Sequence, residues 1–295
     1  MNRILFLGFL LIFANSYIFS QDSQLESNIR IVTNGKKATV GVAVIFDGKD
    51  TLTVNNKYRY PMMSVYKFHQ ALAVLDYLNK NNLPLDTKIP VSQSDLSADT
   101  YSPLRDEKPS GNYDMSVGDL LKYSVSYSDN NACDILFKYM GGTQVVEDYV
   151  KSLGVEDIAI VATEEKMHES PENQYLNWTT PLECARLLEK FTRQNILSEE
   201  HTAFLKNLMI ETTTGKDKIK YLLPDNVKVG HKTGSAVRNE FGIQVAENDI
   251  AFITLPDGKQ YSVAIFVMNS REDDKTNTSL ISSISRVIYD YYKTK

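Results

Sequence analysis

The stretch YPMMSVYKFHQALAVLDYL, residues 60–78, carries the pattern that decides the fold of this chain. Its apolar residues recur every three or four positions: Val65, Phe68, Leu72, Leu75 and Leu78. This period predicts a helix packed against a hydrophobic core. The first turn of the predicted helix nevertheless carries Ser64 and Lys67. Burying a lysine is costly unless a neighbouring group uses or removes its charge.

Ser64 and Lys67 lie three residues apart and therefore share one face of the predicted helix. A serine at a helix start lies among unpaired backbone N–H groups, which favour a developing negative charge. A lysine one turn away can accept the serine proton, so the pair indicates a nucleophile and its base. The alternative is a helix-capping serine beside a lysine that extends its ammonium to water. This spacing alone leaves both interpretations open.

Two further motifs favour the catalytic interpretation. Ser128-Asp129-Asn130 opens a helix-like stretch, and Lys232-Thr233-Gly234 lies on a β-like stretch. Taken singly, the first can be a helix cap and the second an exposed strand end. The order S-x-x-K, S-D-N, K-T-G is the signature of class A β-lactamases and penicillin-binding proteins. The sequence therefore resembles the class A serine β-lactamases, over nearly all of the chain that follows its N-terminal segment.

The secondary-structure pattern predicts an α/β fold. Residues 38–55 read as a hairpin around Asp47-Gly48, and β character returns after Val227, with FGIQVAEN and DIAFITL as separate segments. The region between is mainly helical, and residues 279–292 form a final amphipathic helix. We expect an antiparallel sheet built from both chain ends, flanked by helices, with an inserted all-helical lobe, as in β-lactamases and penicillin-binding transpeptidases. A ligand would bind between the lobes.

The expected boundaries follow from this arrangement. Residues 1–20 form a predicted signal peptide, because a positive start is followed by the uncharged run ILFLGFLLIFA, which is short for a membrane span. An uncleaved anchor is the alternative. The catalytic domain spans 21–295, with an α/β lobe of about 21–60 and 210–295 and a helical lobe of about 61–209.

Composition excludes several classes of function. The 295 residues are 42% hydrophobic and carry a net charge of −5, which gives no electrostatic footprint for nucleic acid or anionic lipid. The four histidines are scattered and make no metal-ligand spacing, so we expect neither a metal nor a cofactor. Cys133 and Cys184 can form a disulfide, but two buried thiols are favoured.

Short stretches extend the resemblance beyond the three motifs. YSPL, residues 101–104, looks like the family's cleft-edge loop with its tyrosine, here Tyr101. TTPLECARLL, residues 179–188, resembles the threonine-proline that leads into a helix after the family's Ω loop. LLPDNVKVGHKTGS, residues 222–235, matches the approach to the third motif.

The resemblance implies a role for each motif residue. Ser64 would be acylated by the β-lactam carbonyl, in an oxyanion hole made by the N–H groups of Ser64 and Ser235. Ser128 would relay a proton to the leaving nitrogen, and Asn130 would bind the substrate's side-chain amide. The substrate carboxylate would be held by the third motif: Lys232, Thr233, Gly234 and Ser235. Lys218 can supply a second positive charge there; the alternative is an exposed helix lysine.

A glutamate decides whether the acyl-enzyme is hydrolysed. The family's spacing from the S-D-N serine and to the K-T-G lysine falls on Glu164, whereas Glu165 is off by one and Glu172 by two helical turns. Four residues after Glu164, where most members have an asparagine that helps hold the water, this chain has His168. A neutral imidazole can donate or accept a hydrogen bond there.

The resemblance implies a periplasmic, monomeric serine β-lactamase whose small-molecule partner is a β-lactam. In the family a hydroxyl residue at the position of Ser235 often accompanies cephalosporin hydrolysis, which suggests a preference for cephalosporins. A histidine at the position of His168 also occurs in a divergent branch of the family that includes cephalosporinases. One alternative is a penicillin-binding D-alanyl-D-alanine peptidase or transpeptidase, and another is a β-lactam sensor that stays acylated. Glu164 argues against both alternatives, because the resemblance implies that proteins without this glutamate remain acylated. A sensor would also need a transmembrane segment.

Overall fold

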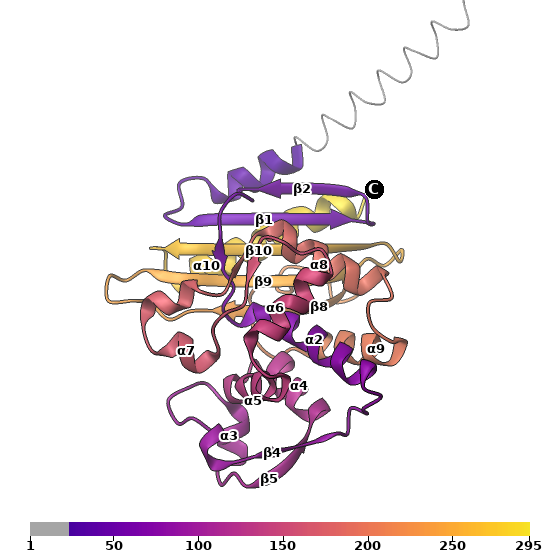
Figure 1. Ribbon diagram of the computed structural model, residues 1–295. Helices are drawn as coiled ribbons and strands as arrows, with labels where there is room; N and C mark the ends of the chain where they lie inside the picture. The colour runs from indigo at the N-terminus through magenta and orange to yellow at the C-terminus, as the bar shows by residue number, and fades with distance from the viewer. Residues whose placement is uncertain (1–23) are drawn as a thin grey trace, which may run out of the picture.

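The computed structural model describes residues 24–295, and the predicted signal peptide lies outside the described residues. Its centre is a five-stranded antiparallel sheet in the order β2-β1-β10-β9-β8 (Figure 1). The strands come from both ends of the chain, which confirms the predicted fold class: β1 (Thr39–Phe46), β2 (Asp50–Val54), β8 (Lys228–Ser235), β9 (Gln244–Thr254) and β10 (Gln260–Ser270).

Local chemistry explains how these strands begin and end. β1 and β2 are joined at Asp47 and Gly48, whose φ angles of 50° and 71° form the tight turn predicted for the hairpin. The prediction of two β segments around Asn248 and Asp249 was wrong, because β9 runs through both without a break. The side chains of Asn248 and Asp249 are buried and hydrogen-bonded to the backbone of Pro61 and Ile219, so the strand can continue through them.

The two faces of the sheet are covered by different helices. Along β1, Val40, Val42 and Val44 face one core, which they share with α10 (Asp274–Tyr292) and the helix over residues 24–33. Ala43 and Ile45 point to the opposite face, because side chains alternate along a strand. That second core contains α2 (Tyr66–Lys80) and α8 (Pro181–Arg193). The sheet is therefore the middle of three layers.

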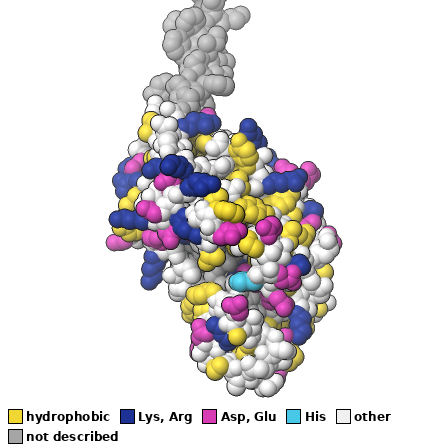
Figure 2. Space-filling view, turned by 90° about the vertical axis from the view of Figure 1, so that its left-hand side faces the viewer, with side chains coloured by type: hydrophobic (Ala, Val, Ile, Leu, Met, Phe, Trp, Pro, Cys, Tyr) yellow, Lys and Arg dark blue, Asp and Glu magenta, His cyan; other side chains and the backbone are white. Residues whose placement is uncertain are grey.

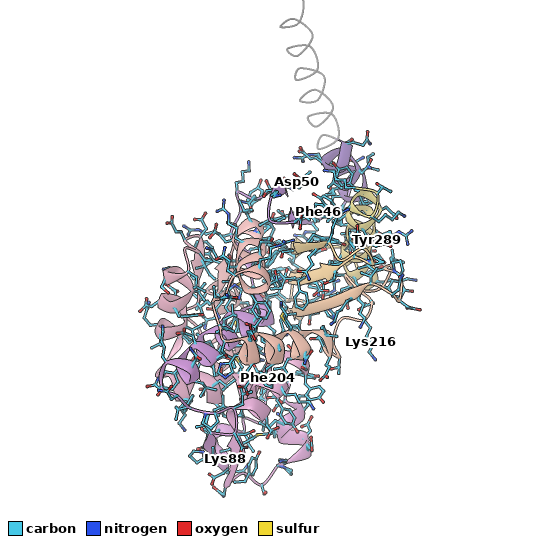
Figure 3. The ribbon with its side chains drawn as sticks, turned by 90° about the vertical axis from the view of Figure 1, so that its right-hand side faces the viewer. Phe46, Asp50, Lys88, Phe204, Lys216 and Tyr289 are labelled. Carbon is cyan, nitrogen blue, oxygen red and sulfur yellow. The ribbon has the colours of Figure 1, made fainter. Side chains whose placement is uncertain are left out.

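The insertion between β2 and β8 is mainly helical, as predicted. Its remaining helices are α3 (Pro103–Glu107), α4 (Val117–Ser126), α5 (Asn130–Met140), α6 (Thr143–Ser152), α7 (Glu164–His168) and α9 (Glu199–Ile210). It also contains short strands that the sequence pattern did not predict: β3 (Tyr60–Pro61), β4 (Lys88–Val91), β5 (Tyr113–Ser116), β6 (Ile158–Ala159) and β7 (Trp178–Thr179). Lys88 of β4 marks the end of the molecule farthest from Phe46 of β1 (Figure 3).

Both cysteines are buried free thiols, so the interpretation favoured from sequence is confirmed. Cys133 lies beside the hydroxyl of Tyr66, and Cys184 beside the ring of His69. Within residues 24–295, none of the helices is both long enough and apolar enough to cross a bilayer.

Candidate active site

Ser64 lies in a tight 3-10 turn, η1 (Met63–Val65), that leads directly into α2. The predicted α-helix therefore begins two residues later than Ser64. Met63 has a φ of 47°, a strained conformation of the kind that gathers at functional sites. β8 passes this turn at close range: a Cβ on Gly234 would collide with the carbonyl oxygen of Met62 and lie 3.1 Å from the backbone nitrogen of Ser64. Only glycine allows the third motif to approach the serine so closely.

Lys67 is completely buried, and its ammonium has three oxygen partners. Nζ donates to the carbonyl oxygen of Ser128 at 2.8 Å and to Oδ1 of Asn130 at 2.5 Å. It also lies 3.0 Å from Oε1 of Glu164. The charge of this lysine is thus compensated inside the protein, and one side chain joins the first two motifs to the glutamate.

Ser128 connects this group to the third motif. Its φ is 59°, a second strained residue at the site, and its Oγ accepts a hydrogen bond of 2.9 Å from Nζ of Lys232. Lys232 is fully buried, and Nζ also donates to the carbonyl oxygen of Thr233. Burial, with the charges of Lys67 and Lys218 nearby, holds the pKa of the Lys232 ammonium well below its usual value.

Asp129 does not point at the reacting groups but fixes the loop around them. Its carboxylate accepts hydrogen bonds from the Ser102 hydroxyl and the backbone N–H of Leu104. The backbone N–H of Asn130 in turn donates to the carbonyl oxygen of Tyr101. These contacts hold the exposed ring of Tyr101 beside the second motif.

Glu164 is the first residue of α7 and is 5% exposed. Asp134 anchors the start of this helix, because its two carboxylate oxygens accept the backbone N–H groups of Glu164 and Glu165 at 2.8 and 2.9 Å. Burial raises the pKa of Asp134 to about 6. Glu165 and Glu172 are both exposed, so of the three glutamates considered from the sequence only Glu164 pairs with Lys67.

His168 closes the same short helix. Its Nδ1 lies 2.8 Å from the carbonyl oxygen of Glu164, to which it can only donate, so in the tautomer that fits this contact Nε2 is left as an acceptor. The ring lines a cavity of about 240 Å³. Figure 2 shows a face of the molecule on which a histidine lies among acidic side chains. The other residues around the cavity come from the loop over residues 97–100, from α5, and from α7 with the residue that follows it: Ser97, Asp99, Thr100, Asn130, Asn131, Asp134, Glu164, Glu165 and Glu169.

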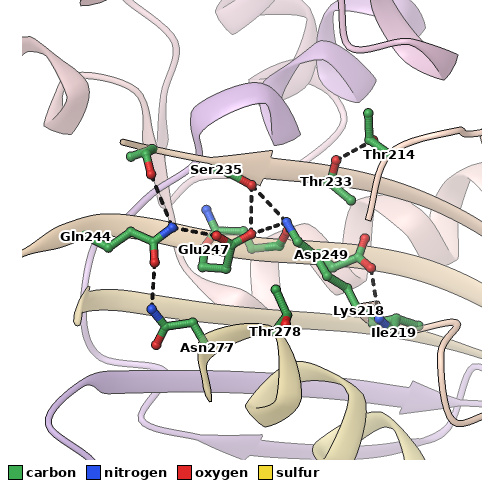
Figure 4. A network of polar contacts seen from close by, with 12 residues as sticks. Thr214, Lys218, Ile219, Thr233, Ser235, Gln244, Glu247, Asp249, Asn277 and Thr278 are labelled. Carbon is green, nitrogen blue, oxygen red and sulfur yellow. Dashed lines mark hydrogen bonds and ion pairs between the residues drawn. The ribbon is translucent and has the colours of Figure 1, made fainter. Parts of the chain in front are cut away.

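The end of β8 carries the remaining predicted residues. The hydroxyls of Thr233 and Thr214 lie 2.7 Å apart. Lys218 is neither helical nor exposed: it is 4% exposed, and its Nζ donates to Oγ of Ser235 at 2.9 Å. The alternative of an exposed helix lysine is therefore wrong. Nζ also forms an ion pair with Glu247 of β9 (Figure 4).

Two acidic residues of the site were missed by sequence reasoning. Asp134 follows the second motif in α5, where it looks like an ordinary helix carboxylate. Glu247 had a usable signal, since the polar run Glu247-Asn248-Asp249 interrupts a strand that is otherwise apolar. Acidic side chains inside such a strand must be paired if they are buried.

Comparisons with known proteins agree with this geometry. Residues 24–292 match the model of the β-lactamase enzyme family. The chain is 44% identical to a β-lactamase of Bacteroides uniformis over 92% of both chains. It is 40% identical to β-lactamase VEB-1 of Pseudomonas aeruginosa, over 100% of this chain and 99% of the other.

Solved structures give the same result. A class A β-lactamase from Bacteroides cellulosilyticus superposes with a TM-score of 0.90 at 46% identity, over 93% of this chain and 99% of the other. The TLA-1 extended-spectrum β-lactamase has the same TM-score at 49% identity, over 92% and 99%. The chain therefore belongs to the β-lactamase enzyme family and is a class A serine β-lactamase, a hydrolase of the β-lactam amide that confers resistance to these antibiotics.

Proposed function

We propose that Ser64 is the nucleophile, and that Lys67, Ser128 and Glu164 move the protons of the reaction. The observation that carries this proposal is the position of Lys67, one helical turn after Ser64. Its ammonium contacts both the carbonyl oxygen of Ser128 and the carboxylate of Glu164. Buried charges in direct contact exchange protons without solvent, and a nucleophilic serine requires a base of this kind.

Acylation follows from these contacts. Lys67 gives a proton to Glu164, and the resulting amine takes the hydroxyl proton of Ser64 while Oγ bonds to the β-lactam carbonyl carbon. The negative charge that develops on the carbonyl oxygen is stabilised by the N–H groups of Ser64 and Ser235. As the amide C–N bond breaks, Lys67 passes its proton through the Ser128 hydroxyl to the leaving nitrogen. Glu164 then returns its proton to Lys67 and is again a carboxylate.

Deacylation uses Glu164 as a general base. Its carboxylate is buried beside the Lys67 ammonium, and it keeps lone pairs that can accept the proton of a water that attacks the ester carbonyl. The bond to Ser64 Oγ then breaks and Lys67 reprotonates the serine. Glu164 passes the proton that it took from the water to Lys67, so both residues return to their starting charges. His168, whose Nε2 remains an acceptor, contributes to holding that water.

The substrate is bound by the other motif residues. Asn130 and the edge residue Tyr101 receive the side-chain amide, while Lys232, Thr233, Gly234 and Ser235 receive the carboxylate, with Lys218 behind Ser235. We propose that cephalosporins are preferred over penicillins because the Ser235 hydroxyl lies at this end of the cleft. TLA-1 and PER-1, two similar proteins, are named extended-spectrum β-lactamases, which supports extended-spectrum substrates as candidates.

The place of action follows from the predicted signal peptide. We propose that residues 1–20 direct export, and that the mature enzyme acts as a monomer in the periplasm.

One kinetic experiment tests the proposal. Purified enzyme is mixed with a chromogenic cephalosporin, and turnover is followed at substrate excess, in parallel with intact-mass spectra. We expect sustained hydrolysis by the wild type, and neither hydrolysis nor a mass adduct with Ser64→Ala. A cephalosporin-derived adduct on Ser64→Ala would refute the assignment of Ser64 as the nucleophile. A wild type that stays acylated would instead indicate a penicillin-binding peptidase or a sensor.

A further inference from the structure

Glu247 is a carboxylate built into the place proposed for the substrate carboxylate. It lies on β9 directly opposite Ser235 of β8 and is 5% exposed. Oε1 accepts the Ser235 hydroxyl at 2.7 Å and pairs with the Lys218 ammonium (Figure 4). The two groups nearest to Ser235 are therefore one cation and one anion of the protein itself.

The Ser235 hydroxyl has a single proton, and Glu247 holds it. Lys218 donates to the same oxygen at 2.9 Å, so Oγ accepts from the lysine and donates to the glutamate. What this oxygen offers toward the cleft is a lone pair. A substrate carboxylate has only lone pairs, so it can accept a hydrogen bond from Ser235 only after the hydroxyl of Ser235 stops donating to Glu247.

Lys218 is similarly committed. Its Nζ pairs with Glu247 and donates to the carbonyl oxygen of Asn248 at 3.2 Å. Because the paired carboxylate cancels most of the lysine's field, Lys218 attracts an anionic substrate much less than an unpaired buried cation does.

Glu247 is also held from behind. Gln244 donates to Oε2 of Glu247 at 2.6 Å, and Asn277 donates to Oε1 of Gln244 at 2.6 Å. Ser270 donates to Asn277 in turn, which ties the chain to the end of β10. The carboxylate therefore cannot turn away when a second anion arrives.

From these contacts we propose that Glu247 is a specificity-determining residue that competes with the substrate carboxylate for Ser235 and Lys218. It weakens the binding of substrates that carry the carboxylate. Lys232 and Thr233 then provide most of the attraction for that carboxylate. This inference rests on the carboxylate subsite proposed above.

The test compares a chromogenic cephalosporin with its neutral C4 methyl ester. The measured quantity is the ratio of the two Michaelis constants, acid over ester, at constant ionic strength. Glu247→Gln keeps the shape but removes the charge and replaces one acceptor oxygen by a donor. We expect the ratio to fall about tenfold, the effect of one buried charge near the ligand. Glu240→Gln removes the same charge from the exposed β8–β9 loop and should change the ratio less than twofold.

Thr233→Val separates failure of this inference from failure of the subsite. It should raise the ratio about tenfold, since it removes a donor to the carboxylate. If Thr233→Val raises the ratio and Glu247→Gln leaves it unchanged, the subsite stands and the role of Glu247 is refuted. If Thr233→Val leaves the ratio unchanged, the subsite and this inference are both refuted. Glu247→Ala, with a melting curve as a check on folding, provides the same test of charge removal should the glutamine variant not fold.

Discussion

The Nζ atom of Lys67 lies 3.0 Å from Oε1 of Glu164, and both side chains are almost completely buried. In this geometry the base proposed for acylation and the base proposed for deacylation are in direct contact. A change at either residue therefore alters the surroundings of the other. The role of each residue must be inferred from whether its variant stops before acylation or at the acyl-enzyme.

Glu164→Gln should stop the reaction at the acyl-enzyme. Glutamine keeps the size of the side chain but cannot accept the proton of the attacking water at neutral pH. We expect deacylation to slow by about 10²–10⁴-fold, the usual contribution of a general base, and intact-mass spectra to show a persistent adduct.

Glu165→Gln is the matched control, because Glu165 is the exposed neighbour in the same helix and should turn over nearly normally. Acylation by Glu164→Gln should also be slower, because the Lys67 ammonium must then lose its proton without the glutamate. The persistence of the adduct, and not the acylation rate, is therefore the decisive measurement. Normal turnover by Glu164→Gln with adduct on the control would mean that the assignment of the loop is off by one residue.

Gly234→Ala should damage catalysis by displacing β8 from the serine turn. The added methyl group collides with the carbonyl oxygen of Met62, so the strand must move away from the backbone nitrogen of Ser64. Loss of an oxyanion donor lowers kcat by about 10²–10³-fold, and steady-state kinetics should show a loss of this size.

Gly258→Ala is the control for this change. Gly258 has a φ of 88° in the β9–β10 turn, and no atom lies within 4 Å of an added Cβ. It should cost about 1 kcal/mol of folding stability through backbone strain and leave kcat/KM unchanged. Wild-type kinetics for Gly234→Ala would show that the close approach is dispensable.

Ser235→Ala should lower kcat/KM for cephalosporins more than for penicillins. The hydroxyl can donate to the substrate carboxylate when its proton turns from Glu247 to the cleft, and alanine removes this donor. The backbone N–H of residue 235 remains available as an oxyanion donor after the change. Parallel kinetics with one substrate of each class measure the effect. Equal losses for both classes would remove the argument for a cephalosporin preference.

Asp134→Asn should change how stability depends on pH. The folded-state pKa of about 6 exceeds the ordinary value of 3.8, so the folded protein binds this proton more tightly than the unfolded chain. The carboxyl therefore adds stability below about pH 4, and this contribution is lost as pH rises through 6. Asparagine is neutral throughout, so its advantage over wild type should grow by up to about 3 kcal/mol between pH 4 and 7. Urea unfolding at several pH values measures this; a constant difference would contradict it.

Much of the fold could be predicted because its signals are local. The hairpin around Asp47-Gly48 needs only a turn and two apolar runs, and both are visible in the sequence. The three motifs likewise fixed Ser64, Ser128 and Lys232 as candidates, since each has a spacing that the chemistry requires.

What could not be predicted depends on partners that are distant in sequence. Glu247 breaks the apolar pattern of β9, and its burial becomes understandable only when Lys218 and Gln244 are placed beside it. The sequence left open whether Lys218 is exposed or part of the site, because its partners Ser235 and Glu247 are distant in sequence. The short strand β4 pairs only with β5, and four residues with a proline give too weak a pattern to recognise.

The pairing of β1 with β10 joins residues from opposite ends of the chain, from Thr39↔Met268 to Phe46↔Tyr261. During synthesis, β1 must wait for its partner until the residues of β10, 260–270, have been added, and such distant pairings are slow to form. The central ladder of the sheet is therefore absent from every nascent chain that still lacks β10. A growing chain of this enzyme is thus kept from folding completely, which is the state that the export proposed above requires.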